Sequence, residues 1–332
     1  MYLLVFVSEV ESQKGRLMES DQREKVSVSI LTYNRSRLLK RLLQSLQDLR
    51  YKCIEIIVID NHSEDDTEEM ISRDFPHVNY IRTNKNIGAS ARNLGLRGAI
   101  SKIIITLDDD VIGIDDNDLI NLVKIFRDRP KLGGVNFKVV DDINGHICNW
   151  IHHCKPDEYS DKEFKTYEIT EGAAAFRKDA LEKAGYYPED FFLSYEGPDL
   201  ALRIIDSGYD IIYSDIVSVI HYHSNSGRKP WLNYYFDTRN QLWLAARNFP
   251  LSYAIIFLAR GLLSMFVYSI RDGYLFFWFK GIIDGLKGLR PAFEARNVVS
   301  PNTMRFIKSV DKNRPSFIYL VKNRLFKKGI RL

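Results

Sequence analysis

Three consecutive aspartates, Asp108, Asp109 and Asp110, directly follow a short apolar run, residues 103–107. The run predicts a buried β-strand. Three adjacent carboxylates repel one another and would be costly in a core, so we expect them at the carboxyl end of this strand, where a divalent cation can neutralise them. In open α/β sheets that end is where ligands bind. A solvated acidic turn is the alternative that this feature alone leaves open.

Strand and helix patterns alternate on both sides of the aspartates. The expected strands before them are 26–31, 54–59, 77–82 and 102–107, and the expected helices are 36–49, 64–72 and 90–100. This alternation predicts an α/β fold with a mostly parallel, mixed sheet flanked by helices. The polar loops at 33–35, 60–63 and 108–110 each follow a strand, so we expect them to meet at one edge of the sheet, the usual place for a nucleotide.

The remaining sequence predicts further elements and three parts of the chain. After residue 111 we expect helix 119–127, strand 133–140, an irregular polar section 141–170, regular structure again from 171, helices 178–184 and 198–207, short strands 211–213 and 216–222, and helix 231–248. The expected parts are a poorly ordered segment 1–24, a globular domain 25–250 with a nucleotide half 25–111 and an acceptor half 112–250, and an extension 251–332.

The formal net charge of +4 hides an uneven distribution. Residues 251–332 carry 15 Lys and Arg against 4 Asp and Glu, so the first 250 residues are net acidic. The extension is apolar and aromatic, but a span over 249–270 would hold Arg260 near its middle, which is expensive in a bilayer. We therefore expect amphipathic helices that lie on a membrane surface, with a packed appendage or a dimer surface as alternatives.

The three cysteines are too few for a disulfide framework, which favours free thiols and the cytoplasm. Cys148, His152, His153 and Cys154 lie close together, but their spacing fits none of the usual zinc patterns. The basic tail is not organised as a nucleic-acid-binding module, so no nucleic acid is expected as a partner. An oligomer is left open.

Eight short segments then resemble a known family. Residues 28–35, 55–63, 86–93 and 107–111 follow the order seen in family 2 glycosyltransferases of the GT-A fold. Residues 171–177, 191–203, 221–224 and 234–240 are similar to their bacterial rhamnosyltransferase-like branch. The resemblance covers about residues 26–250. It implies the GT-A nucleotide-diphospho-sugar transferase fold, with the basic helical extension added at its carboxyl side.

The resemblance implies an inverting, metal-dependent transfer of a sugar. The donor would be a UDP- or dTDP-sugar, and the acceptor a hydroxyl of a glycan or lipid-linked molecule in bacterial surface polysaccharide synthesis, at the inner face of the cell membrane. Tyr33 would stack on the base and Asp60 would accept its imide N–H, although Asp60 is also typical of a turn. Arg92 would reach a phosphate or the sugar, unless it is a surface residue of its helix. The implied donor-binding residues are Thr32, Tyr33, Asn34, Arg35, Asp60, Asn86, Arg92, Asp108, Asp109 and Gly172.

The resemblance also implies a site for Mg²⁺ or Mn²⁺, ions that suit oxygen ligands and a diphosphate. Asp110 is the expected direct ligand, and Asp108 would contact ribose or metal-bound water. His221 would complete the metal or diphosphate site, and His223 is a possible substitute. A strand-end histidine bonded to the backbone is the alternative for His221.

The catalytic base is where the sequence departs from the family pattern. The family usually has Glu-Asp before the helix, with the Asp as general base, whereas this chain has Glu196 and Gly197. We expect Glu196 to be the base and Asp199 to be a structural or acceptor-binding carboxylate that also caps the helix; the reverse assignment is open. The missing aspartate also favours an alternative function, a catalytically weak sugar-nucleotide-binding subunit or scaffold.

Overall fold

The computed structural model describes residues 24–222, 229–315 and 319. The expectation that residues 1–24 are poorly ordered falls, apart from Glu24, outside the described residues, and so does the alternative ligand His223.

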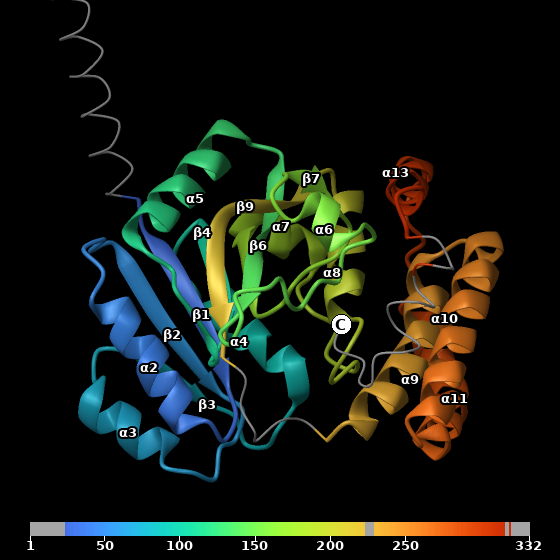
Figure 1. The fold of residues 1–332 in the computed structure, drawn as a ribbon, viewed down its shortest axis with the longest axis horizontal. Helices are drawn as coiled ribbons and strands as arrows, with labels where there is room; N and C mark the ends of the chain where they lie inside the picture. Colours follow the sequence, from blue (N-terminus) through green and yellow to red (C-terminus); the bar gives the residue numbers. More distant parts are fainter. Residues whose placement is uncertain (1–23, 223–228, 316–318, 320–332) are drawn as a thin grey trace, which may run out of the picture.

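A mixed, nine-stranded sheet forms the centre of the molecule (Figure 1). Its order is β3-β2-β1-β4-β8-β6-β9-β5, with β7 paired to β9. The strands are β1 Val26–Thr32, β2 Ile54–Asp60, β3 Asn79–Arg82, β4 Ile103–Asp108, β5 Val111–Ile112, β6 Leu132–Asp141, β7 Phe164–Lys165, β8 Ala173–Arg177 and β9 Asp210–His221. The first four strands in this order are parallel, and the antiparallel β8 follows them. The predicted fold class is confirmed.

The register of the parallel strands brings their carboxyl ends into line. Thr32 at the end of β1 pairs with Asp60 at the end of β2, and its neighbour Leu31 pairs with Asp108 at the end of β4. The polar loops that follow these strands therefore start at one edge of the sheet, as the sequence predicted. This edge is where the candidate site is built.

Helices cover both faces of the sheet, and two apolar cores separate them from it. One core contains the buried leucines of α2 and α5, and the other contains Leu96 of α4 together with buried alanines and leucines of α7 and α8. The helices, with one 3-10 turn η1, are α2 Ser36–Gln47, α3 Thr67–Asp74, η1 Gly88–Ala91, α4 Arg92–Gly98, α5 Asp116–Asp128, α6 Pro156–Tyr159, α7 Lys178–Ala184 and α8 Glu196–Asp206. The helix expected at 64–72 starts later, at Thr67, because the side chain of Asp65 bonds to the backbone N–H of Thr67 and of Ser36.

The acceptor half differs from the prediction in several short elements (β5, α6 and β7) and most clearly in its last strand. The two short strands expected at 211–213 and 216–222 are a single long strand, β9, which runs parallel to β6 with a register shift between Asn136 and Lys138. The polar pair Ser214 and Asp215 lies at this irregularity, and a β-bulge explains why the apolar pattern is interrupted while pairing continues. The section 141–170 covers this strand with α6, β7 and stacked aromatic side chains.

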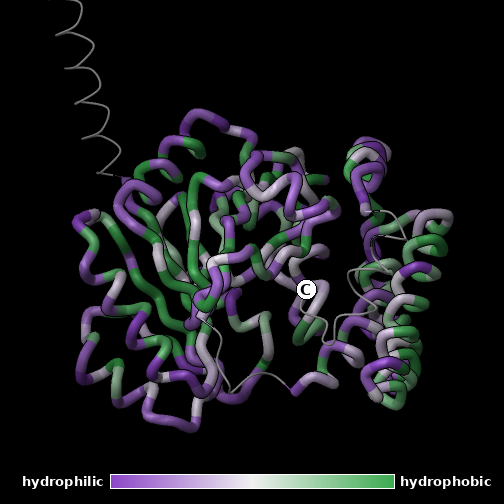
Figure 2. Tube along the Cα trace, in the orientation of Figure 1, coloured by the Kyte–Doolittle hydropathy of each residue, from purple (hydrophilic) through white to green (hydrophobic). Residues whose placement is uncertain are grey.

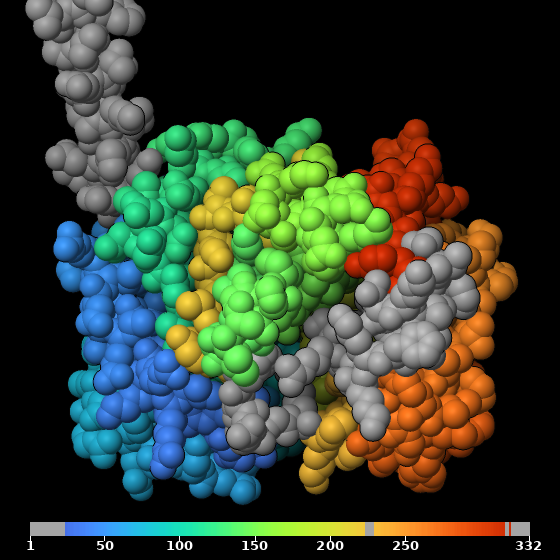
Figure 3. All heavy atoms as spheres, in the orientation of Figure 1, coloured from blue at the N-terminus to red at the C-terminus, as the bar shows by residue number. Residues whose placement is uncertain are grey.

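Helices after residue 230 form a separate group beside the sheet (Figure 1). They are α9 Trp231–Asn248, α10 Leu251–Arg271, α11 Leu275–Lys287, α12 Leu289–Glu294 and α13 Pro301–Asp311. Helix α9 packs against α10, α11 and α12. In the space-filling view helices α10 to α13, which we call the C-terminal lobe, lie on the side opposite the amino-terminal strands (Figure 3). The division at residue 250 stays a prediction, because α9 contacts both this lobe and the loop before α8.

Candidate functional site

Two of the three aspartates are held by one arginine. Arg35 donates from the same nitrogen to Asp109 Oδ1 at 3.1 Å and to Asp110 Oδ2 at 2.5 Å. Thr32 donates to the other oxygen of Asp109 at 2.7 Å. Burial raises the pKa of Asp109 to about 7, against the opposite effect of Arg35. Asp109 is therefore an internal link between the ends of β1 and β4, whereas Asp110 lies further along the edge.

The short strand β5 brings Asp110 next to His221. Val111 pairs with His221 across the antiparallel β5–β9 contact, and the N–H of Tyr222 donates to the carbonyl of Asp110 at 2.8 Å. His221 Nε2 lies 3.5 Å from Asp110 Oδ2. Burial alone would lower the pKa of His221, but Asp110 and Cys148 raise it to about 10. The structure thus brings the predicted pair, Asp110 and His221, together. The imidazole lies next to a carboxylate, which argues against the alternative that it bonds only to the backbone.

The first aspartate, Asp108, belongs to a second group. Arg92 at the start of α4 donates to Asp108 Oδ1, and the backbone N–H of Asp108 donates to the carbonyl of Gly172 at 3.0 Å. A β-carbon added at Gly172 would lie 2.2 Å from Asp108 Oδ2, so only glycine fits against this carboxylate. Arg92 is 4% exposed, which excludes the alternative of a surface helix residue, while the Asp108 side chain is 33% exposed. The structure therefore brings together Arg92, Asp108 and Gly172, three of the predicted donor-binding residues.

Two buried polar groups beside this cluster lack hydrogen bonds to the residues that the structure describes. They are Nε of Arg92 and the hydroxyl of Tyr187. Buried polar groups of native proteins are nearly always satisfied, and the exceptions indicate an absent ligand, water or ion. Both atoms are buried, so the observation favours a bound water or ion beside Arg92.

The base-binding end of the site is only partly as predicted. Tyr33 is 42% exposed and can offer its ring to a base. Asp60, by contrast, is fully buried: one oxygen accepts from the N–H of Ser63 at 2.7 Å and the other from the hydroxyl of Tyr80 at 2.5 Å. These bonds are those of the turn-forming alternative, and a contact of Asp60 with a base stays a prediction. Tyr80 was missed because nothing in its strand pattern indicates a role.

Asparagines hold the loops that surround the donor edge. Asn34 has a positive φ of 55° and accepts the N–H of Glu64 at 2.7 Å. Asn86 accepts from the side chain of Asn61 at 3.0 Å and from the N–H of Gly88 at 2.9 Å. In this structure Asn34 and Asn86 shape the loops, and direct contact with a donor stays a prediction for both.

The start of α8 holds the carboxylates expected to act on the acceptor. Asp199 is 2% exposed and both its oxygens are used, one by Arg203 at 2.6 Å and one by Asn248 at 2.8 Å. The helix has no side-chain cap, so the expectation that Asp199 caps it was wrong; the side chain instead ties α8 to α9. Glu196 is 4% exposed. A β-carbon at Gly197 would lie 2.2 Å from Oε1 of Glu171, a residue of the family-like segment 171–177 to which the sequence alone assigned no role.

The loop before α8 is clamped in an unusual backbone conformation. Phe192, Ser194 and Tyr195 all have positive φ, between 63° and 68°. The buried side chain of Asn240 donates to the carbonyls of Phe191, Leu193 and Ser194 at 2.6–3.0 Å. Left-handed conformations of such residues cost of order 1 kcal/mol each and cluster at functional sites. The segment 234–240 thus acts here by holding the loop that positions Glu196.

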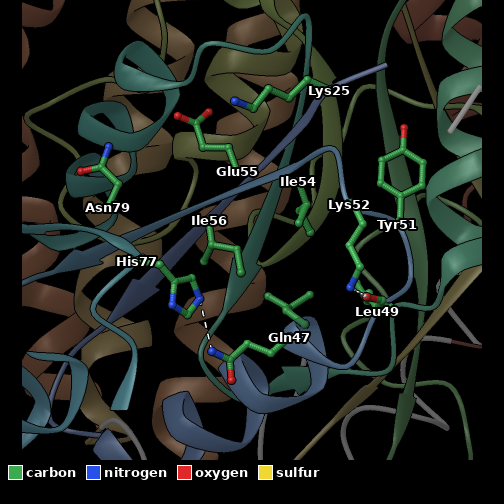
Figure 4. Close-up of a pocket in the computed structure, with 11 residues that line it drawn as sticks. Lys25, Gln47, Leu49, Tyr51, Lys52, Ile54, Glu55, Ile56, His77 and Asn79 are labelled. Atoms are coloured by element: carbon green, nitrogen blue, oxygen red, sulfur yellow. Dashed lines mark hydrogen bonds between the residues drawn. The ribbon is translucent and has the colours of Figure 1, made fainter. Parts of the chain in front are cut away.

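Two hollows in the described part of the surface lie elsewhere. One is lined by residues at the amino ends of β1 and β2, among them Lys25, Ile54 and Glu55, and by Gln47 and His77, whose side chains are 3.2 Å apart (Figure 4). This is the edge of the sheet opposite the aspartates. In α/β sheets ligands bind at the carboxyl ends of the strands, so this hollow is not the candidate site.

The donor set at the aspartate edge suits a hard divalent cation. No cluster of three or more His, Cys, Asp and Glu side chains converges among the described residues. Mg²⁺, however, is usually held by one or two carboxylates together with substrate phosphates, rather than by an all-protein cage. Asp110 and the half-buried Asp108 supply the carboxylates of that pattern, and His221 lies 3.5 Å from Asp110 beside them. In this structure the Arg35 guanidinium pairs with the Asp110 carboxylate and neutralises its charge.

Comparison with known proteins agrees with this geometry. Residues 27–185 match the family model for glycosyl transferase family 2. This part of the chain belongs to the family. The match covers the edge built by β1, β2 and β4 and ends just after α7, so α8 and the C-terminal helices lie outside it. The protein is therefore a glycosyltransferase of family 2.

The curated relatives include enzymes of surface polysaccharide synthesis. O-antigen chain rhamnosyltransferase RfbN of Salmonella typhimurium is 27% identical over 64% of this chain and 71% of its own length. O-antigen chain rhamnosyltransferase WbaN of Salmonella anatum is 26% identical over 55% of this chain and 61% of its own length. Poly-beta-1,6-N-acetyl-D-glucosamine synthase of Staphylococcus epidermidis is 28% identical over 63% and 53%. This chain thus spans between about half and about seven tenths of these relatives, and the predicted rhamnosyltransferase-like branch is confirmed.

Solved structures support the fold. The mannosyltransferase PcManGT of Pyrobaculum calidifontis, in complex with GDP-Man and Mn²⁺, aligns with a TM-score of 0.53 over 91% of this chain and 82% of that one, at 18% identity. TarS of Staphylococcus aureus in complex with UDP-GlcNAc aligns with a TM-score of 0.56 over 86% and 88%, at 17% identity. At these identities the likeness shows the GT-A fold alone.

Proposed function

We propose that this glycosyltransferase is an inverting, metal-dependent enzyme that moves a sugar from a UDP- or dTDP-sugar to a hydroxyl of a glycan or lipid-linked acceptor in bacterial surface polysaccharide synthesis. The observation that carries the proposal is the aspartate edge. Asp110 with His221, and Asp108 with Arg92, lie at the carboxyl ends of the sheet strands, where a diphosphate and its cation would be held. One structural neighbour, PcManGT, holds GDP-Man and Mn²⁺, and another, TarS, holds UDP-GlcNAc, which supports a metal and a nucleotide sugar here.

The roles follow from the positions of the side chains. Tyr33 offers an exposed ring for stacking with a base. Arg92 holds Asp108 and adds positive charge where the donor phosphates or sugar would lie. Asp110 and His221 would hold Mg²⁺ or Mn²⁺, which would neutralise the charge on the leaving diphosphate. In one displacement the acceptor oxygen bonds to the anomeric carbon, the bond to the diphosphate breaks, and a carboxylate on the acceptor side takes the hydroxyl proton.

A donor screen tests this proposal directly. Thermal unfolding is measured with UDP-, dTDP- and GDP-sugars, each with and without Mn²⁺. We expect one pyrimidine donor to raise the melting temperature only when Mn²⁺ is present. At a donor concentration a hundred times Kd, binding adds about 2.7 kcal/mol to the free energy of unfolding. Stabilisation by a GDP-sugar would reject the pyrimidine assignment, and equal stabilisation without metal would reject the metal.

A binding subunit without turnover is the second candidate, because Gly197 replaces the expected aspartate. It predicts donor stabilisation with no sugar transfer to a glycan or lipid-linked acceptor. Measuring transfer on the donor that the screen selects separates the two functions.

We also propose that the C-terminal lobe lies on the cytoplasmic face of the membrane. Its packing resembles that of membrane helices, with small residues inside and large apolar ones outside. Added β-carbons at Gly281 and Gly285 of α11 would lie 2.7 Å from Tyr235 O and 2.4 Å from Leu242 of α9, and one at Gly261 of α10 would lie 1.7 Å from Gln241. The glycine faces therefore point towards α9.

The same helices are rich in hydrophobic residues (Figure 2), and many of the large ones are exposed. Of the large apolar residues that are exposed in the described part of the chain, those in this lobe are Leu251, Ile255, Ile256, Leu263, Val267, Ile270, Phe276, Phe279, Ile283, Leu286, Phe293 and Val298. Helix α10 is the one described helix with the length and composition to cross a membrane, yet Arg260 is exposed midway along it. This arrangement favours helices that lie in the interface.

Vesicle flotation checks the membrane proposal. We expect wild type to float with vesicles that contain anionic lipid, and the triple variant Ile256→Glu, Phe276→Glu, Ile283→Glu to lose most of this binding, because each change removes apolar area that the membrane would bury and adds repulsion. Ile143→Glu is the matched control, since Ile143 is 80% exposed but lies outside the lobe. Equal flotation of wild type and the triple variant, or none by either, would contradict membrane contact through this face.

A further inference from the structure

Gly197 and Glu171 fit together as a pair. Gly197 is the second residue of α8, where the resemblance to the family would place an aspartate. A β-carbon at this position would meet Glu171 Oε1 at 2.2 Å, the carbonyl of Ile169 at 2.8 Å and Glu171 Cδ at 3.0 Å. No side chain fits there while Glu171 keeps its place. The space that a residue-197 side chain would enter is filled by the carboxylate of another residue.

The backbone of Glu171 is anchored at the donor edge. Its carbonyl accepts from the hydroxyl of Thr106 at 2.6 Å, and the carbonyl of the next residue, Gly172, accepts from the N–H of Asp108 at 3.0 Å. The segment 171–172 is thereby held along the end of β4. Glu171 therefore starts beside Asp108 and reaches across to α8, so its carboxylate lies between the donor carboxylates and the acceptor-side helix.

Charge and exposure also separate Glu171 from the other carboxylates. Burial would lower the pKa of Arg92, and Glu171, after Asp108 and Tyr187, is one of the groups that raise it, so the Glu171 carboxylate lies within electrostatic reach of the donor cluster. Glu171 is half-buried, whereas Glu196 is 4% and Asp199 2% exposed. Asp199 is further bound by Arg203 and Asn248.

We infer that Glu171 is the general base of this enzyme, supplied from the loop before β8 in place of a carboxylate at residue 197. The inference rests on the proposed transfer reaction and replaces Glu196 as the expected base. In the step, the acceptor O–H proton passes to the Glu171 carboxylate as the acceptor oxygen bonds to the anomeric carbon. The electron pair of the broken carbon–oxygen bond leaves on the nucleoside diphosphate, so atoms and charge balance.

The test compares Glu171→Gln with Glu196→Gln in the full-length protein, with the donor that the screen selects and a glycan or lipid-linked acceptor. We expect Glu171→Gln to lower kcat about a hundredfold or more, the usual range for loss of a general base, with the donor-induced thermal shift unchanged. Glu196→Gln is expected to lower kcat at least about tenfold less than Glu171→Gln does. The unchanged thermal shift also shows that Glu171→Gln is folded.

Rescue by a small carboxylate distinguishes a base from a structural role. Glu171→Ala leaves a space next to Gly197, and added formate is expected to restore part of the rate, whereas chloride at the same concentration is not. Wild-type kcat in Glu171→Gln, a loss confined to donor affinity, or failure of formate to restore any rate would each overturn the assignment. A loss in Glu196→Gln alone would return the base to Glu196. If wild type binds donor but transfers no sugar, the proposed function fails and this inference falls with it.

Discussion

Replacing Gly172 by alanine is expected to lower sugar transfer about a hundredfold while leaving the fold intact. The added methyl group would lie 2.2–2.9 Å from three atoms of the Asp108 carboxyl group, so this carboxylate has to move. Its movement also displaces the partner of Arg92. Misplacement of reacting groups by about 1 Å can cost about a hundredfold in rate, even when no functional group is lost. Transfer rate, donor-induced thermal shift and melting temperature without donor are measured together.

Gly98→Ala is the matched control for this change. Gly98 ends α4, and a β-carbon added there would meet no atom within 4 Å beyond its chain neighbours and the backbone of its own helix. Alanine there is expected to leave transfer unchanged and to alter stability by less than about 1 kcal/mol. Full activity of Gly172→Ala would show that the position of Asp108 does not matter for the donor. A large fall in melting temperature without donor would instead assign Gly172 to folding.

The fold was predictable where local patterns and covalent limits agree. Helix α9 runs from Trp231 to Asn248 as expected, since Pro230 precedes it and Pro250 follows it, and proline is tolerated at a helix start but not inside. The apolar runs of β1, β2 and β4 also gave the correct strands and their common edge. The bulge in β9 was not predictable, because it depends on pairing with β6 and not on the polar residues themselves.

The sequence predicted those parts of the site that depend on residues close together in the chain. The aspartates and the loops beside them were found because parallel strands end at one edge. The bond between Asp199 and Asn248, by contrast, joins residues 49 positions apart and is decided by the packing of α8 on α9. The contact between Glu171 and Gly197 is likewise a tertiary one. A missing aspartate is visible in a sequence, but the carboxylate that fills its space is not.

Asp110→Asn is expected to abolish the Mn²⁺-dependent part of donor binding and to lower transfer about a thousandfold. The amide keeps the size of the side chain but removes the charge that a divalent cation needs, and loss of a metal's charge stabilisation costs several kcal/mol, where each ~1.4 kcal/mol is tenfold in rate. The free energy of unfolding without metal should fall by less than the loss in donor binding, because Arg35 keeps its bond to Asp109. The measurement is the thermal shift on adding Mn²⁺ and the selected donor, followed by the transfer rate.

Asp109→Asn and Asp161→Asn complete the comparison, since each removes one carboxylate charge. Asp161 pairs with Lys138 and its side chain is 73% exposed, so its loss should change neither metal response nor rate. Asp109 is buried against Thr32 and Arg35, so its amide should lower stability yet leave the Mn²⁺ response in place. If the response instead disappears in Asp109→Asn and survives in Asp110→Asn, the metal ligand is Asp109. The pair His221 and Asp110 would then have only a structural role, because their 3.5 Å contact would no longer mark a cation site.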